Sequence, residues 1–187
     1  MTGSNKIPQS IETERLILKS YLNGDEIDFL AFVKDNREHL KRFDVLDKWT
    51  INIDNIEDAK KYVKQMQVGW LMKKIFAYSV WQKTDNKYIG EYKLFRVNWD
   101  KKELELGGFI SKEFEGLLFP REICDSLYLL VFKSMEFNKI NGICRKDNVV
   151  PRFWIERSKF FKKDSETVTH IYYSMTCENY FMQQKKY

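Results

Sequence analysis

Proline and glycine are scarce in this 187-residue chain, which has only three prolines and eight glycines. Disordered segments and flexible linkers are rich in these residues and poor in aromatic ones. Aromatic side chains are instead abundant, with 14 Phe, 10 Tyr and 5 Trp. The length is within the range of a single domain with a substantial hydrophobic core. We therefore expect one domain over residues 1–187, with residues 1–12 as a polar lead-in.

Cysteine and histidine are too sparse for the sites that they usually form. The cysteines are Cys124, Cys144 and Cys177, and the histidines are His39 and His170. An odd number of widely separated cysteines is typical of reduced thiols and not of a disulfide framework. A zinc site needs close pairs of Cys or His, which the sequence lacks. We expect no metal, and thiols that pack as small apolar side chains.

Long apolar runs are also missing, because none reaches the roughly 18 residues that a membrane span requires. The first ten residues, MTGSNKIPQS, lack the apolar region of a secretory signal. We expect a cytoplasmic protein with no membrane partner. The net charge of +5 is modest, and its lysines are spread along the chain. This pattern favours a solvated surface over nucleic-acid binding, for which no motif is present.

The order of hydrophobic patterns predicts a domain that mixes helices and strands. Three β-rich runs follow two helical patterns, and the short turns KTDNK and DKK between them indicate an antiparallel meander. The expected strands are 15–22, 75–82, 88–99, 103–110, 140–145 and one within 169–184. The expected helices are 24–40, one that ends near Lys74 and is capped by Asp54 or Asn55, 120–137 and 148–158. The fold class is therefore α/β or α+β with a mixed sheet.

The run ELELGGFI, residues 103–110, has two glycines inside a predicted strand. Alternation places one set of side chains on one face of the sheet, namely Glu103, Glu105, Gly107 and Phe109. Paired glycines inside a strand indicate a bulge, an edge, or close approach by a ligand or another backbone. The sequence leaves these alternatives open.

Immediately after this strand, the stretch SKEFEGLLFP combines a glycine turn with a helix start. Pro120 suits the first turn of a helix, and Gly116 stands just before it. Free backbone N–H groups at a helix N-terminus form a ready site for phosphate. Many such turns merely connect two elements, so this motif alone allows both interpretations.

Three segments taken in order resemble successive signatures of the GCN5-related N-acetyltransferases (GNAT), and in particular of the RimJ/RimL type. They are TERLILKSYLNGDEIDFLAF, YIGEYKLFRVNWDKKELELGGFISKEFEG and INGICRKDNVVPRFWIERSKF, and together they span most of residues 13–165. The resemblance implies a mostly antiparallel sheet of six to seven strands flanked by about four helices. It also implies acetyl-CoA as co-substrate and a primary amine as acceptor.

In that family, acetyl-CoA lies along the splayed fourth strand, and a loop of the form Q/R-x-x-G-x-G/A binds its pyrophosphate. The resemblance assigns cofactor contacts to Phe109, Ile110, Ser111, Glu115, Gly116, Leu117, Leu118, Phe119, Arg121 and Asn148. Glu105 corresponds to a glutamate that could take the proton of the amine, and Glu91 is a second candidate. Glu105 could equally be a cross-strand partner of a lysine. Asn148 could contact pantetheine, cap a helix, or do both.

The sequence departs from the family pattern at four positions. Glu113 stands where Gln or Arg is usual, and Leu118 replaces the second small residue of the loop. Pro151 replaces a serine and Lys159 a glycine. Candidates for the general acid are then Ser126, Cys144 and Tyr128, chosen only because their elements are near.

Three functions remain open. The first is an N-acetyltransferase, monomeric or homodimeric, that acts on a protein N-terminus, an amino sugar or another small amine. Its acceptor pocket would come from residues 24–74, where aromatic side chains could line it or simply pack, namely Phe43, Trp49, Tyr62 and Trp70. The second is a catalytically impaired module that binds a protein or a nucleotide. The third, RNA binding, depends only on the positive charge.

Overall fold

The computed structural model describes residues 7–42 and 52–185. These residues form one eight-stranded sheet, with the strand order β1-β2-β3-β4-β5-β6-β8-β7. The strands are β1 (Ser10–Glu12), β2 (Leu16–Ser20), β3 (Phe76–Gln82), β4 (Lys87–Asn98), β5 (Glu103–Ile110), β6 (Lys139–Arg145), β7 (Lys162–Glu166) and β8 (His170–Thr176). Within the described ranges every neighbouring pair is antiparallel except β5 and β6. The predicted mixed sheet is confirmed.

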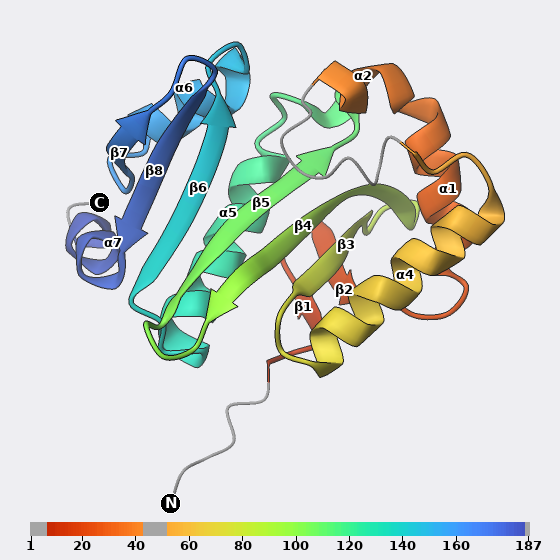
Figure 1. The fold of residues 1–187 in the computed structure, drawn as a ribbon, viewed down its shortest axis with the longest axis horizontal. Coiled ribbons are helices and arrows are strands. Elements are labelled where there is room, and N and C mark those ends of the chain that lie inside the picture. The colour runs from red at the N-terminus through yellow and green to blue at the C-terminus, as the bar shows by residue number, and fades with distance from the viewer. Residues whose placement is uncertain (1–6, 43–51, 186–187) are drawn as a thin grey trace, which may run out of the picture.

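Helices cover both faces of this sheet (Figure 1). They are α1 (Asp25–Asp35), α2 (Arg37–Arg42), α4 (Ile56–Leu71), α5 (Phe119–Leu129), α6 (Val149–Arg157) and α7 (Cys177–Gln184), with a short 3₁₀ turn η1 (Lys112–Phe114) and a π-helical turn η2 (Leu130–Ser134). Helices α1 and α4 lie on one face, over β3 and β4, and α5 lies on the other (Figure 1). No helix in these ranges is long and apolar enough to cross a membrane.

Two clusters of buried side chains result from this layering. The larger one lies between the sheet and α5 and includes Leu104, Ile110 and Ile123. The second lies under α1 and α4 and includes Phe29 and Tyr62, whose rings stack at 4.5 Å. The two faces predicted for residues 103–110 are confirmed, because Leu104 and Ile110 pack toward α5 while Phe109 packs against the second cluster.

The helix ends follow the predicted signals. Asn55 is the N-cap of α4, and its side-chain oxygen accepts hydrogen bonds from the N–H groups of Glu57 and Asp58. Pro120 lies in the first turn of α5. Backbone N–H groups in that turn have no acceptor within the helix, so the absence of an N–H on proline costs no hydrogen bond. Asn148 occupies the N-cap position of α6, but its side chain makes no capping bond.

Several expected boundaries were wrong. The strand expected within residues 169–184 is β8, but residues 177–184 form the additional helix α7, because Thr176 accepts a capping bond from the Asn179 N–H. Residues 10–12, placed in the lead-in, pair with β2 as β1. Residues 162–166, all exposed, pair with β8 as the edge strand β7. The described residues therefore hold eight strands and six α-helices, against six to seven strands and about four helices expected.

Candidate active site

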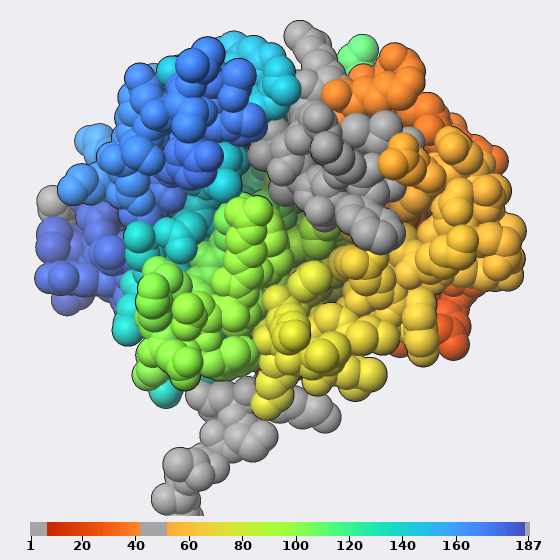
Figure 2. All heavy atoms as spheres, in the orientation of Figure 1, coloured from red at the N-terminus to blue at the C-terminus, as the bar shows by residue number. Residues whose placement is uncertain are grey.

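The sheet opens between β5 and β6. These strands pair in parallel only from Glu103 to Glu105, opposite residues 139–141. Beyond that point β5 pairs with β4 alone and β6 with β8 alone, so the two strands diverge (Figure 1). The edge of β5 that faces β6 is therefore without a strand partner over residues 106–110. In the space-filling view the green β4–β5 segment lies between the yellow α4 and the blue C-terminal elements (Figure 2).

The glycines near this opening are required by close packing. A Cβ on Gly108 would lie 2.4 Å from the ring Cγ of Tyr92 and 2.6 Å from the carbonyl oxygen of Glu91. A Cβ on Gly90, opposite on β4, would lie 2.3 Å from the carbonyl oxygen of Phe109. Gly108 thus meets a neighbouring strand and ring and is not a bulge. The pairing is irregular at two other places, between β3 and β4 at Val80 and Trp81 and between β4 and β5 from Phe95 to Asn98.

The loop after β5 combines two unusual backbone conformations. Residues 114–117 form a type II turn, in which the Leu117 N–H donates to the Phe114 carbonyl at 3.3 Å. Gly116 has φ 82°, as the third position of that turn requires. Leu118, the N-cap of α5, is also left-handed, with φ 63°. This conformation costs a non-glycine residue about 1–2 kcal/mol, a cost that a glycine at this position would avoid.

Free donors gather at the end of this loop, around the N-terminus of α5. Within the described ranges, no hydrogen-bond partner is present for the backbone N–H groups of Gly116, Leu118, Phe119 and Arg121. Leu117 and Leu118 are about half exposed, at 51% and 48%, so neither side chain fills a buried space. An exposed group of N–H donors at the positive end of a helix is suited to binding an anion.

The two acidic residues of the loop have basic partners. Glu113 forms an ion pair with Lys87, at the start of β4. The Glu115 carboxylate lies 3.3 Å from Nε2 of His39 on α2. Arg121, expected to contact the cofactor, lies 3.6 Å from Asp125 on its own helix and is not paired with either acid of the loop. The acids therefore point at side chains of neighbouring elements, which reduces the repulsion that two unpaired carboxylates would exert on a bound anion.

Glu105 is located where β5 still pairs with strands on both sides, opposite Phe95 and Asn141. Its carboxylate accepts a hydrogen bond from Nη1 of Arg96 at 2.6 Å. Burial raises the pKa of Glu105 above its ordinary value, although the Arg96 guanidinium opposes that rise. The expected cross-strand partner of Glu105 is thus an arginine and not a lysine.

A second carboxylate, Glu91, lies fully buried on the same face of the sheet. The hydroxyl of Tyr21 donates to it at 2.5 Å and that of Tyr62 at 2.6 Å. The ammonium of Lys93 lies 3.3 Å from it and 3.2 Å from the Tyr62 hydroxyl. Tyr88 continues the chain, with its hydroxyl 2.7 Å from that of Tyr21. The sequence pointed to Glu91 and Tyr62 separately, but not to the network, because its members come from three separate segments.

The candidates for the general acid are mostly engaged in packing. The Ser126 hydroxyl donates to the Ile123 carbonyl inside α5. Tyr128 packs edge-on against Phe161, and burial raises the pKa of its phenol well above the ordinary value. Burial likewise raises the pKa of the Cys144 thiol to about 11. Among the aromatic residues proposed for an acceptor pocket, Trp70 packs on Phe76 and Tyr78. Phe43 and Trp49 lie outside the described residues.

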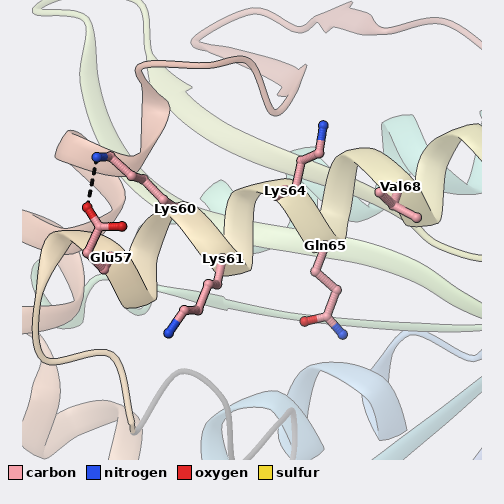
Figure 3. A pocket seen from close by; sticks show the side chains of 6 residues that line it. All are labelled: Glu57, Lys60, Lys61, Lys64, Gln65 and Val68. Atoms are coloured by element: carbon pink, nitrogen blue, oxygen red, sulfur yellow. Dashed lines mark hydrogen bonds and ion pairs between the residues drawn. The ribbon is translucent and has the colours of Figure 1, made fainter.

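A hollow on the outer side of α4 does not belong to this opening. Its six lining residues all come from that one helix and are Glu57, Lys60, Lys61, Lys64, Gln65 and Val68 (Figure 3). Glu57 is paired with Lys60, and the remaining polar side chains project outward (Figure 3). Lysines arranged in this way along an exposed helix are typical of a solvated face.

Comparison with known proteins identifies the family. Residues 15–160 match the sequence model of the acetyltransferase (GNAT) domain. The chain therefore belongs to the GNAT acetyltransferase family and is an acyltransferase. No curated protein matches it by sequence.

Solved structures with the same fold are distant in sequence. The ribosomal-protein-S5-alanine acetyltransferase of Vibrio fischeri has 16% identity and a TM-score of 0.78, over 90% of this chain and 97% of that one. RimL, a ribosomal L7/L12 acetyltransferase solved with coenzyme A, has 16% identity and a TM-score of 0.76, over 91% of this chain and 97% of that one. The microcin C7 self-immunity acetyltransferase MccE, solved with acetyl-CoA and AMP, has 15% identity and a TM-score of 0.78, over 90% of this chain and 97% of that one.

Proposed function

We propose that this protein transfers the acetyl group of acetyl-CoA to a primary amine. The observation that carries the proposal is the combination of free N–H donors at the start of α5 with the unpaired edge of β5 beside them. The N–H donors are suited to an anionic nucleotide, and the strand edge is suited to an extended chain that contains amides. Acetyl-CoA contains both groups. Membership of the family supports the same substrate.

The residues that would hold acetyl-CoA are those around the opening. The N–H groups of Gly116, Leu118, Phe119 and Arg121 are suited to the diphosphate. The β5 backbone near Phe109 and Ile110 can pair with the amides of the pantetheine arm, as a strand edge pairs with any extended chain. The Asn148 side chain makes no capping bond and is free to contact that arm as well. Acetyl-CoA supplies the activated acetyl group as a thioester.

The reaction needs a base because an alkyl ammonium group with a pKa near 10 has no lone pair for attack. We assign this role to Glu105, acting directly or through a water molecule. Glu105 first takes one proton from the ammonium group, which leaves a neutral amine. The amine nitrogen then forms a bond to the acetyl carbon and the carbon–sulfur bond breaks. The second proton leaves the nitrogen and passes, directly or through water, to the departing thiolate, which gives the amide and the CoA thiol. Its raised pKa makes it a stronger base than an exposed carboxylate.

The acceptor would approach from the face covered by α1 and α4, where Glu105 and the Glu91 network lie. We propose a RimJ/RimL-like enzyme, for which the acceptor is a protein N-terminus, an amino sugar or another small amine. The motif TERLIL and the fold shared with RimL and with the S5-alanine enzyme support this assignment. One domain over residues 1–187 is consistent with the continuous eight-stranded sheet.

Thermal unfolding with and without acetyl-CoA tests donor binding. At 100 times the dissociation constant, binding stabilises the protein by about 2.7 kcal/mol. For a chain of this size that corresponds to about 5–11 °C in melting temperature. No change at millimolar acetyl-CoA would remove the basis for an acetyltransferase and favour the impaired binding module. The ion pair of Glu113 with Lys87 argues against that module, because it makes the loop less repulsive to an anion than its sequence implies.

The role of Glu105 is tested separately. Glu105→Gln should lower kcat by about 10²–10⁴-fold, the usual contribution of a general base, while keeping the acetyl-CoA shift. Glu103→Gln, on the same face two residues earlier, is the matched control and should retain kcat. Equal activity of Glu105→Gln and the wild type would exclude Glu105 as the base.

A further inference from the structure

Arg15, in the segment that precedes β2, reaches across the molecule to the loop before α5. Its Nε donates to Oε2 of Glu122 at 2.7 Å and its backbone N–H to Oε1 at 2.8 Å. Its Nη1 lies 3.4 Å from the carbonyl oxygen of Leu117, and its guanidinium lies 4.2 Å from the ring centre of Phe119. The Thr13 hydroxyl adds a hydrogen bond to Glu122 at 2.5 Å. The segment that contains Thr13 and Arg15 therefore contacts the end of the loop and the first turn of α5 at three residues, namely Leu117, Phe119 and Glu122.

The contacts of Arg15 bracket the left-handed residue of the loop. Leu117 and Phe119 are the two neighbours of Leu118, whose φ is 63°. A leucine left to itself prefers a right-handed or extended conformation. Fixing the carbonyl before it and the ring after it restricts the backbone between them. The N–H groups of Leu118 and Phe119, which have no partner within the described ranges, are on this restricted backbone.

Arg15 also balances a charge at the same helix end. Glu122 lies in the first turn of α5, where an unpaired carboxylate would repel a bound anion. Burial raises the pKa of Glu122, but hydrogen bonds from Thr13 and Arg15 outweigh burial and hold the pKa below its ordinary value. The carboxylate is thus ionised at neutral pH, and Arg15 neutralises it.

We propose that Arg15 is a positioning residue for acetyl-CoA, which holds Leu117, Leu118 and Phe119 so that their loop is preformed for the diphosphate. This inference rests on the proposed function. The alternative is that Arg15 only joins the N-terminal segment to the rest of the fold. The two explanations predict different effects of removing Arg15 on acetyl-CoA binding when Leu118, the left-handed residue of the loop, is replaced by glycine.

The test measures the dissociation constant of acetyl-CoA by calorimetry for the wild type, Arg15→Ala, Leu118→Gly and the double variant. Arg15→Ala should weaken binding about tenfold, since relaxation of a left-handed leucine is of that magnitude. In the Leu118→Gly background the same change should weaken binding by about twofold or less, because glycine adopts this conformation without the contacts. A steady-state assay should show the effect in KM for acetyl-CoA and not in kcat.

Lys83→Ala is the matched control. Lys83 holds the same N-terminal segment, through the Thr13 carbonyl at 2.7 Å and Glu12 at 3.2 Å, and no contact to the loop is present among the described residues. It should leave the dissociation constant unchanged. If Arg15→Ala does not fold, Arg15→Lys keeps the charge without the planar group and should still weaken binding severalfold in the wild type but not in Leu118→Gly.

Two results would overturn the inference. One is that Arg15→Ala binds acetyl-CoA as tightly as the wild type does. The other is that Arg15→Ala weakens acetyl-CoA binding by the same factor in the wild type and in Leu118→Gly. Absence of binding by the wild type would instead reject the proposed function itself, and the inference with it.

Discussion

Replacement of Gly108 by alanine should destabilise the protein more than the same replacement of Gly142 on β6. The new Cβ would lie 2.4 Å from the ring of Tyr92 and 2.6 Å from the carbonyl oxygen of Glu91. The ring could turn, but a backbone oxygen in the middle of β4 cannot move without shifting the strand. Overpacking of this kind costs about 1–3 kcal/mol, and the fixed oxygen places Gly108→Ala near the upper end.

The expected change in melting temperature follows from the size of the chain. A protein of 150–250 residues loses about 2–4 °C for each kcal/mol, so a cost near 3 kcal/mol lowers the melting temperature by about 6–12 °C. Differential scanning calorimetry measures this directly. Because β5 also borders the proposed acetyl-CoA site, its displacement should weaken acetyl-CoA binding as well.

Gly142→Ala on β6 is the control for this prediction. Its Cβ would meet only the Phe161 ring, at 3.9 Å, which is an ordinary contact. An alanine there reduces the freedom of the unfolded chain and should leave stability unchanged or raise it by about 0.4–1 kcal/mol. A Gly108→Ala protein that melts within about 2 °C of the wild type would refute the close packing of β4 on β5.

Three further predictions concern the loop and the buried carboxylates. Gly116→Ala meets no atom within 4 Å but keeps φ 82°, so it should cost about 1–2 kcal/mol of stability without any clash, and a calorimetric loss far above that would contradict the turn geometry. Glu91→Gln replaces the buried carboxylate that accepts hydrogen bonds from Tyr21 and Tyr62 and should cost about 1–3 kcal/mol by urea denaturation, and unchanged stability would contradict the buried network. The folded-state pKa of Glu122 is lowered, so its contribution to stability is present above the ordinary Glu pKa and lost as pH falls through the folded value. Melting temperatures of the wild type and Glu122→Gln should therefore differ at pH 7 and converge toward pH 3, and a constant difference would refute the ionised tether.

The sequence predicts the parts of the fold that depend on local patterns. Alternation along 103–110 and the capping signals at Asn55 and Pro120 act within a few residues, and they appear where expected. The strand at 162–166 could not be foreseen, because KKDSE has no apolar alternation and depends on pairing with β8. The strand expected within 169–184 is present as β8, but the helix that follows it was not predicted and starts at the Thr176 cap.

The candidate site is harder to predict because its contacts join distant segments. The family resemblance pointed to the loop and to Glu105, but not to the partners that decide how the loop behaves. Arg15 and Glu122 are 107 positions apart in sequence. The partners of Glu113 and Glu115 come from β4 and α2. The left-handed conformation of Leu118 cannot be predicted from the composition of the sequence or from its hydrophobic periodicity.

The central claim is that backbone N–H groups at the start of α5 bind the diphosphate of acetyl-CoA. Amide chemical shifts recorded by NMR during a titration with acetyl-CoA test it most directly. The largest saturable changes should occur at Gly116, Leu118, Phe119 and Arg121, with further changes along residues 106–110. Saturable binding that leaves these amides unchanged would contradict the claim.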